Sequence, residues 1–82
     1  MDMKYIMFKG NSDFIMFPES MSHYQVIPSG YVVKSAGFVD IVPGPEGGTQ
    51  VKAHCSGESV TLNIKSRPDH DSLVITIALN QE

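Results

Sequence analysis

The chain has 82 residues. A chain of this length buries only about 60–65% of its unfolded surface, so we expect one domain over residues 1–82. Lys and Arg total 6 against 9 Asp and Glu, which gives a net charge of −3 with the basic residues scattered. This balance argues against a protein that binds nucleic acid by neutralising phosphates.

Cysteine usage and hydropathy indicate the compartment. The single cysteine, Cys55, cannot form an internal disulfide, which is typical of a reducing cytoplasm. The apolar start is broken by Lys9, Asn11 and Asp13, so we expect no signal peptide. No stretch approaches the roughly 18 apolar residues of a membrane helix, and the sequence predicts a cytoplasmic protein without membrane contact.

The first predicted element is a β-hairpin. Residues 5–8 (YIMF) and 14–17 (FIMF) flank a Gly10-Asn11 pair that suits a two-residue turn. This turn pairs Met7 with Phe14 and Ile6 with Ile15. Both faces of the hairpin are then apolar, one with Ile6, Phe8, Ile15 and Phe17 and the other with Tyr5, Met7, Phe14 and Met16.

A short helix is predicted next. Pro18 ends the second strand because it has no backbone N–H, and Ser20 or Ser22 is placed to cap a helix. Pro28 and Gly30 stop that helix after about two turns.

Residues 31–42 predict a strand interrupted at residues 35–37. Gly37 indicates a bulge or the close approach of another backbone. Residues 43–48 (PGPEGG) are typical of a turn-rich loop.

A second hairpin is predicted from residues 49–55 and 59–65. Both stretches alternate apolar and polar residues, and a Gly57-Glu58 turn separates them. The side chains expected to point inward are Val51, Ala53, Cys55, Val60, Leu62 and Ile64.

The last stretch favours both a strand and a helix. Residues 74–77 (VITI) have strand propensity. Ser66 with Asp69 resembles a capping box, Pro68 suits the first turn, and the aspartates complement the helix dipole. We predict a helix after Pro68.

Three segments carry a resemblance to a known group of proteins. Residues 35–39 (SAGFV), 57–62 (GESVTL) and 65–72 (KSRPDHDS) resemble segments of small uncharacterised bacteriophage and prophage proteins, in which Ser-Arg-Pro opens a terminal helix. The run VITIAL departs from that group, whose helix is richer in Ala, Glu and Arg. The resemblance implies host cytoplasm and no known activity.

Metal and catalytic chemistry have little support in the sequence. His23, His54, Cys55 and His70 do not have the spacing of a zinc site, and we predict no metal and no cofactor. Cys55 on the inward side of a strand predicts a buried thiol. In Asp69-His70-Asp71, neighbouring helical residues point in different directions, so the aspartates are explained by the helix start. We predict no catalytic residue.

One small-ligand site is predicted. Lys65, Ser66 and Arg67 lead into a helix N-terminus, where free N–H groups favour an anion. The alternative is a serine cap between solvated basic side chains.

The hairpin face formed by Tyr5, Met7, Phe14 and Met16 is the predicted partner-binding surface. Met and aromatic side chains adapt to partner surfaces. The alternative is that the short helix after Pro18 covers this face within the chain.

The predicted fold class is α+β, an antiparallel sheet of about five strands with one or two helices. The leading predicted function is a non-enzymatic binding protein, a phage accessory or anti-defence factor that binds itself and a host protein. The alternatives are an oligomer that sequesters an anionic nucleotide or metabolite, and a small enzyme that uses His23, Cys55 or His70.

Overall fold

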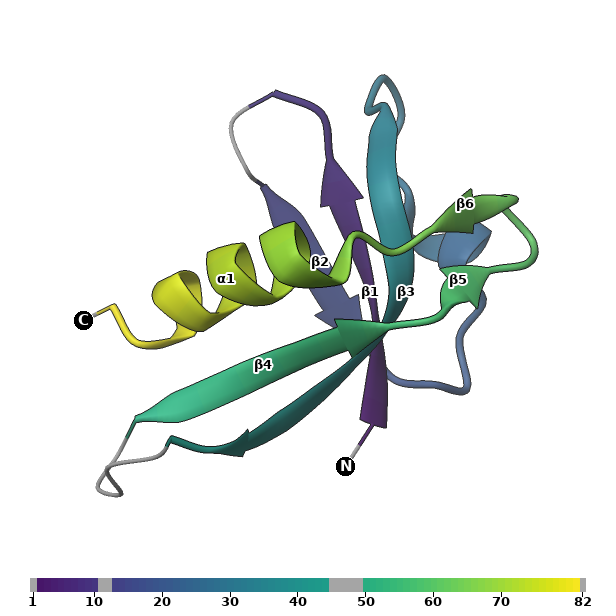
Figure 1. Cartoon of the computed structure of the whole chain (residues 1–82). Helices are drawn as coiled ribbons and strands as arrows, with labels where there is room; N and C mark the ends of the chain where they lie inside the picture. The colour runs from purple at the N-terminus through teal and green to yellow at the C-terminus, as the bar shows by residue number, and fades with distance from the viewer. Residues whose placement is uncertain (1, 11–12, 45–49, 82) are drawn as a thin grey trace.

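The protein has the predicted α+β architecture. A computed structural model describes residues 2–10, 13–44 and 50–81. The elements in chain order are β1 (Asp2–Phe8), β2 (Phe14–Phe17), the 3-10 turn η1 (His23–Val26), β3 (Val33–Pro43), β4 (Val51–Ser56), β5 (Glu58–Ser59), β6 (Ile64–Lys65) and α1 (Pro68–Leu79) (Figure 1). An antiparallel four-stranded sheet has the order β2-β1-β3-β4, and β5 and β6 form a small second sheet.

The register of the first hairpin is confirmed. Met7 pairs with Phe14 and Ile6 with Ile15, as an even-length loop requires. Gly10 has φ of 117°, the left-handed region that glycine adopts at low cost. Asn11 and Ser12, the rest of the predicted turn, lie outside the described residues.

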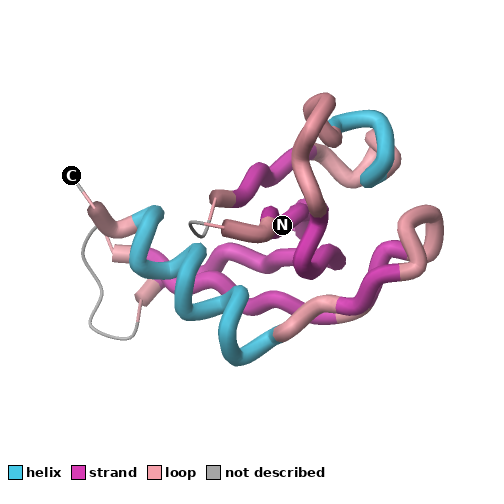
Figure 2. Tube along the Cα trace, turned by 90° about the horizontal axis from the view of Figure 1, so that it is seen from above, coloured by secondary structure: helices cyan, strands magenta, loops and turns pink. Residues whose placement is uncertain are grey.

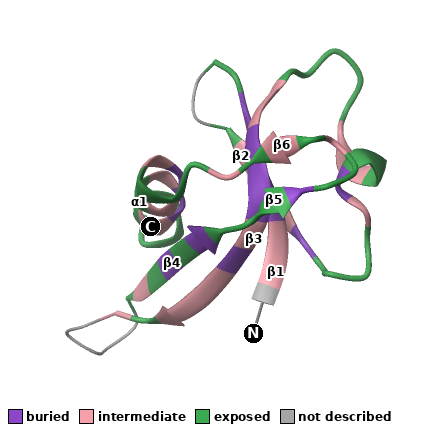
Figure 3. Ribbon diagram, turned by 45° about the vertical axis from the view of Figure 1, so that its right-hand side comes forward, coloured by how far each residue is buried: buried purple, intermediate pink, exposed green. Residues whose placement is uncertain are grey.

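Both faces of this hairpin are covered by the chain itself. One face, called the helix face below, packs under α1. Its core consists of Tyr5, Met7, Val39, Ala53, Cys55 and Ile75. The opposite face carries Ile6, Phe8, Phe17 and Ala36, packed against residues of the η1 and β5–β6 segments. Figure 2 shows α1 and η1 on opposite sides of the strands, and Figure 3 shows buried residues along the middle of the sheet.

β3 is one continuous strand, so the interruption predicted at residues 35–37 is wrong. The irregularity lies beside them, where Met7 pairs with Ser35 but Phe8 pairs with Val33, which leaves Lys34 as the extra residue of a bulge. The close approach predicted at Gly37 is confirmed. A Cβ atom there would lie 2.5 Å from the Ser56 carbonyl oxygen.

The predicted second hairpin is wrong. β4 pairs with β3 along residues 51–56. Residues 60–63 form a turn between β5 and β6, with Asn63 at φ of 55°. Val60, predicted to point inward, is 84% exposed. In residues 59–65 the predicted inward positions hold only at Leu62 and Ile64, which pack on the face opposite α1. The alternation predicted for Val51, Ala53 and Cys55 is confirmed, because these three are less exposed than Lys52 and His54 between them.

The short helix after Pro18 is a single 3-10 turn instead of two helical turns. Its N-cap is Ser22, one of the two serines predicted to cap this segment. The Ser22 N–H donates to Gln25 Oε1 at 2.7 Å. Beyond β3, Gly44 N donates to the Gln50 carbonyl at 2.9 Å, and the predicted loop residues 45–48 lie outside the described residues.

The C-terminal helix is confirmed, but its N-cap is Arg67 and not Ser66. The Ser66 N–H donates to the Gly57 carbonyl at 3.0 Å, which holds Ser66 in the extended chain that leaves β6. Pro68 is at the first helical turn, as predicted.

Candidate functional site

Side chains of α1 close the outer edge of β4. Alternate residues of an antiparallel strand point their N–H and C=O groups to the same side. On the side of β4 away from β3, the N–H groups donate at 2.9 Å to side chains of α1 and of its C-cap, Asn80: Val51 to Asn80 Oδ1, Ala53 to Thr76 Oγ1 and Cys55 to Ser72 Oγ. The three acceptors are four residues apart, so they form one row along α1 and its C-cap. This row prevents another strand from pairing with β4.

At the opposite edge of the sheet, no strand of the described residues lies beyond β2. The Phe8 N–H donates to the Asp13 carbonyl at 2.9 Å, so by alternation Ile15 and Phe17 bond to β1. The N–H and C=O groups of Phe14 and Met16 then point away from the sheet. Within the described ranges, no hydrogen bond joins these outward groups to another residue. The strand (FIMF) carries no charge and no proline, two of the usual blocks to strand addition.

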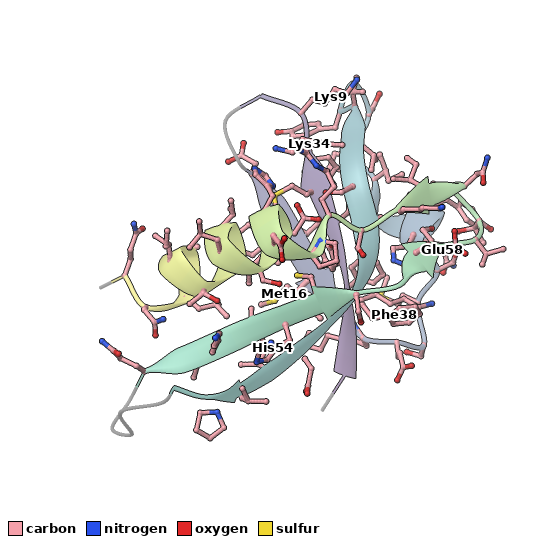
Figure 4. All side chains as sticks on the ribbon, viewed as in Figure 1. Lys9, Met16, Lys34, Phe38, His54 and Glu58 are labelled. Atoms are coloured by element: carbon pink, nitrogen blue, oxygen red, sulfur yellow. The ribbon has the colours of Figure 1, made fainter. Side chains whose placement is uncertain are left out.

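The predicted partner-binding face is divided between core and edge. Tyr5 and Met7 are fully buried, because β1 lies between β2 and β3 and α1, not the short helix predicted after Pro18, packs over this face. Phe14 and Met16 are half-buried at the edge and pack against the helix-face core (Met16 is labelled in Figure 4). Of the four residues, only these two retain accessible surface.

A buried carboxylate fixes the start of α1 to the sheet. Asp71 is fully buried, and its Oδ2 accepts hydrogen bonds from the Tyr5 hydroxyl at 2.5 Å and from the Arg67 N–H at 3.0 Å. Its Oδ1 lies 2.9 Å from His70 Nδ1. The expectation that the side chains of His70 and Asp71 diverge is therefore wrong, since they meet in the first turn of the helix.

The charge states in this cluster follow from burial and hydrogen bonding. The pKa of the Tyr5 phenol is raised, mainly by burial and also by the neighbouring Asp71 carboxylate, so the phenol stays protonated. Burial alone would raise the pKa of Asp71, but hydrogen bonds from His70, Tyr5 and the Arg67 backbone outweigh it and lower that pKa. Asp71 is an ionised acceptor, and His70 Nδ1 is the donor to it.

His70 is oriented like a general base but faces the chain's own lysine. A carboxylate at Nδ1 fixes the imidazole and leaves Nε2 to accept a proton. Lys34 Nζ lies 3.5 Å from Nε2. The network thus runs from Lys34 through His70 and Asp71 to Tyr5, and it joins β3, α1 and β1.

The other residues considered for catalysis are buried. Cys55 is 6% exposed, and burial raises the pKa of its thiol, which disfavours the reactive thiolate. His23 is 3% exposed, and its Nε2 lies 2.9 Å from the Gly37 carbonyl. Burial lowers the pKa of His23. Its ring packs edge-on between Phe17 and Phe38, where it fastens the η1 segment to β3.

The predicted anion-binding residues lie in sequence at the junction of β6 and α1. Lys65 and Arg67 are exposed and Ser66 is half-buried. The Arg67 and Ser66 N–H groups are already bonded, to Asp71 and Gly57. Asp69 and Asp71 in the first turn place negative charge at this helix end. The chain's own carboxylates therefore compete with an anion there.

The described residues contain neither a metal-ligand cluster nor a membrane-spanning helix. In ranges 2–10, 13–44 and 50–81, no group of three or more His, Cys, Asp or Glu side chains could hold a metal ion. Across the same ranges, no helix has the length and hydropathy to span a membrane. Comparison with protein-family models, curated proteins and solved structures finds no match to this chain.

Proposed function

We propose that this chain is a non-enzymatic binding protein that acts by protein–protein contact, and that partners add to it at β2. The observation that carries the proposal is the difference between the two edges of one sheet. The β4 edge is capped by side chains of α1 and its C-cap residue Asn80, whereas no described residue bonds to the outward backbone groups of the uncharged strand β2.

Strand addition at β2 would use both the backbone and the side chains. The outward N–H and C=O groups of Phe14 and Met16 supply the hydrogen-bond ladder, which gives affinity for any extended segment. Their half-buried side chains form the apolar contact on the helix face, and Ile15 forms it on the opposite face. Aromatic and Met side chains are common in interface cores.

The resemblance to small phage and prophage proteins supports a role as an accessory or anti-defence factor that occupies a host protein's surface. Such a role requires binding and no chemistry. The burial of Cys55 and His23 and the closed network around His70 agree with a protein that does not catalyse a reaction.

Capture from host lysate tests the proposal when edge variants are compared. Met16→Pro removes an outward N–H that β1 does not use, and Met16→Lys places a charge at the edge. Val60→Lys is the matched control, because Val60 is 84% exposed on a turn away from this edge. Host proteins retained by the wild type and Val60→Lys but lost by both Met16 variants would support β2 as the binding element. Equal capture by all four proteins would contradict it, provided that circular dichroism shows the variants folded.

A further inference from the structure

We infer that the strand that pairs with β2 is β2 of a second copy of this chain, in an antiparallel arrangement about a two-fold axis at Ile15. This inference rests on the proposed function, because it names the occupant of the same edge. The pairing would join two four-stranded sheets into one continuous sheet.

The register follows from which backbone groups point outward. Phe14 and Met16 carry the outward N–H and C=O groups of β2. If Ile15 lies on the axis, Phe14 of each copy faces Met16 of the other, and each outward group finds a partner within the strand. If the axis moves one residue towards Pro18, Phe14 faces Pro18 of the other copy. The Phe14 carbonyl is then left unpaired, because proline has no N–H to donate. The axis at Ile15 is therefore the register that satisfies the whole edge.

The side chains of this strand are compatible with their own copies. Pairing about a two-fold axis brings each residue of the strand close to the same residue of the other copy. This is unfavourable for charged side chains and neutral or favourable for apolar ones. FIMF carries no charge, and the flanking Asp13 would lie opposite Phe17 and not opposite another carboxylate. On the helix face, the thioether of Met16 would contact the ring of Phe14 from the other copy, a favourable sulfur–aromatic pair.

The length of the strand limits the strength of the dimer. β2 has four residues, so the ladder is short and the contact is smaller than a standard interface of roughly 1,600 Å². We therefore expect a dimer that forms and dissociates with concentration. A weak self-contact of this kind keeps the apolar edge covered until another strand replaces it.

Disulfide trapping at the axis tests the register. Opposite residues of a non-hydrogen-bonded antiparallel pair have Cα atoms about 4.5 Å apart, within the range that a disulfide spans. Ile15→Cys should therefore cross-link rapidly to its own copy under mild oxidation. Val60→Cys, at a more exposed position, reports random collision. The wild type controls for Cys55, which is buried.

The mass in solution, measured by light scattering across a concentration series, completes the test. The wild type and Val60→Lys should rise from 9.0 kDa towards twice that value, while Met16→Lys stays at 9.0 kDa. A wild type that remains at 9.0 kDa at every concentration, or Ile15→Cys cross-linking no faster than Val60→Cys, would overturn the self-pairing. If such a monomer still captured a host protein that Met16→Lys loses, the binding role would stand and only its self-pairing would fail.

Discussion

The hydroxyl of Thr76 on α1 accepts a hydrogen bond from the backbone N–H of Ala53 on β4 at 2.9 Å. Ala53 is on the outer side of an edge strand, where a free N–H would otherwise be available to another chain. The same relationship repeats one helical turn away in each direction, at Ser72 and Asn80. A helix thus takes the place of a fifth strand at this edge.

Removal of one of the three side-chain acceptors should destabilise the β4 edge and expose it to solvent locally. Thr76→Val keeps the shape of the side chain and removes the acceptor, so we expect a loss of about 0.5–1.5 kcal/mol in the free energy of unfolding. Amide hydrogen exchange should speed up at Ala53. The Cys55 amide, whose Ser72 acceptor remains, is the internal control. Unchanged exchange at Ala53 would show that the Thr76 hydroxyl does not protect this edge.

The Tyr5–Asp71 contact should contribute to global stability. Tyr5→Phe removes a buried donor and leaves the ionised Asp71 carboxylate with fewer hydrogen bonds, so we expect a loss of about 1–3 kcal/mol in urea unfolding. Tyr24→Phe, at a tyrosine that is 62% exposed, should change stability little. Equal effects of the two substitutions would mean that the buried network adds nothing.

His23 should make stability depend on pH. Its pKa is lowered in the folded state below the ordinary value of 6.5, because burial disfavours the imidazolium. The unfolded chain therefore binds the proton first as pH falls, and stability is lost from about pH 6.5 down to the folded pKa.

The variant His23→Gln removes this titration. Between about pH 7.5 and about pH 5, the wild type should lose more free energy of unfolding than His23→Gln, whatever their difference at pH 7.5. His54→Gln, at an exposed histidine, should follow the wild type. Parallel pH profiles for the wild type and His23→Gln would contradict the burial effect.

Gly37 should tolerate no side chain. A Cβ atom there would lie 2.5 Å from the Ser56 carbonyl oxygen and 3.2 Å from Ser66 Cβ, so Gly37→Ala requires backbone movement. We expect a loss of about 1–3 kcal/mol in thermal or urea unfolding. Gly44→Ala, whose closest contacts are at 3.3 Å, is the milder comparison. A stability for Gly37→Ala equal to that of the wild type would show that β3 and the Ser56–Gly57 segment are less closely packed.

Local signals in the sequence predicted the elements that local chemistry determines. The Gly10-Asn11 pair and the flanking apolar runs were enough for the register of the first hairpin. The helix after Pro68 was predicted from its start, although residues 74–77 have strand propensity. Tertiary contacts support that outcome, because only a helix aligns Ser72, Thr76 and Asn80 along β4.

Strand order could not be predicted from local signals. The alternation in residues 59–65 favoured a hairpin with residues 49–55. β4 pairs instead with β3, the strand before it in the chain, and alternation alone does not distinguish between these two neighbours. The same limit applies to the candidate site. Tyr5 and Met7 were predicted to bind a partner or to be covered by the short helix after Pro18, because nothing in their sequence neighbourhood shows that α1 packs over this face. The polar residues at every fourth position, Ser72, Thr76 and Asn80, were a signal for the capped edge.

The most direct test of an open β2 edge is the exchange rate of its own amides in dilute solution. The N–H groups of Phe14 and Met16 should exchange rapidly, while those of Ala53 and Cys55 on the capped edge are protected. A rise in protein concentration should then slow exchange at Phe14 and Met16. If these two amides were as protected as Ala53 in the dilute protein, the edge would be covered within the chain and β2 would not be available for binding.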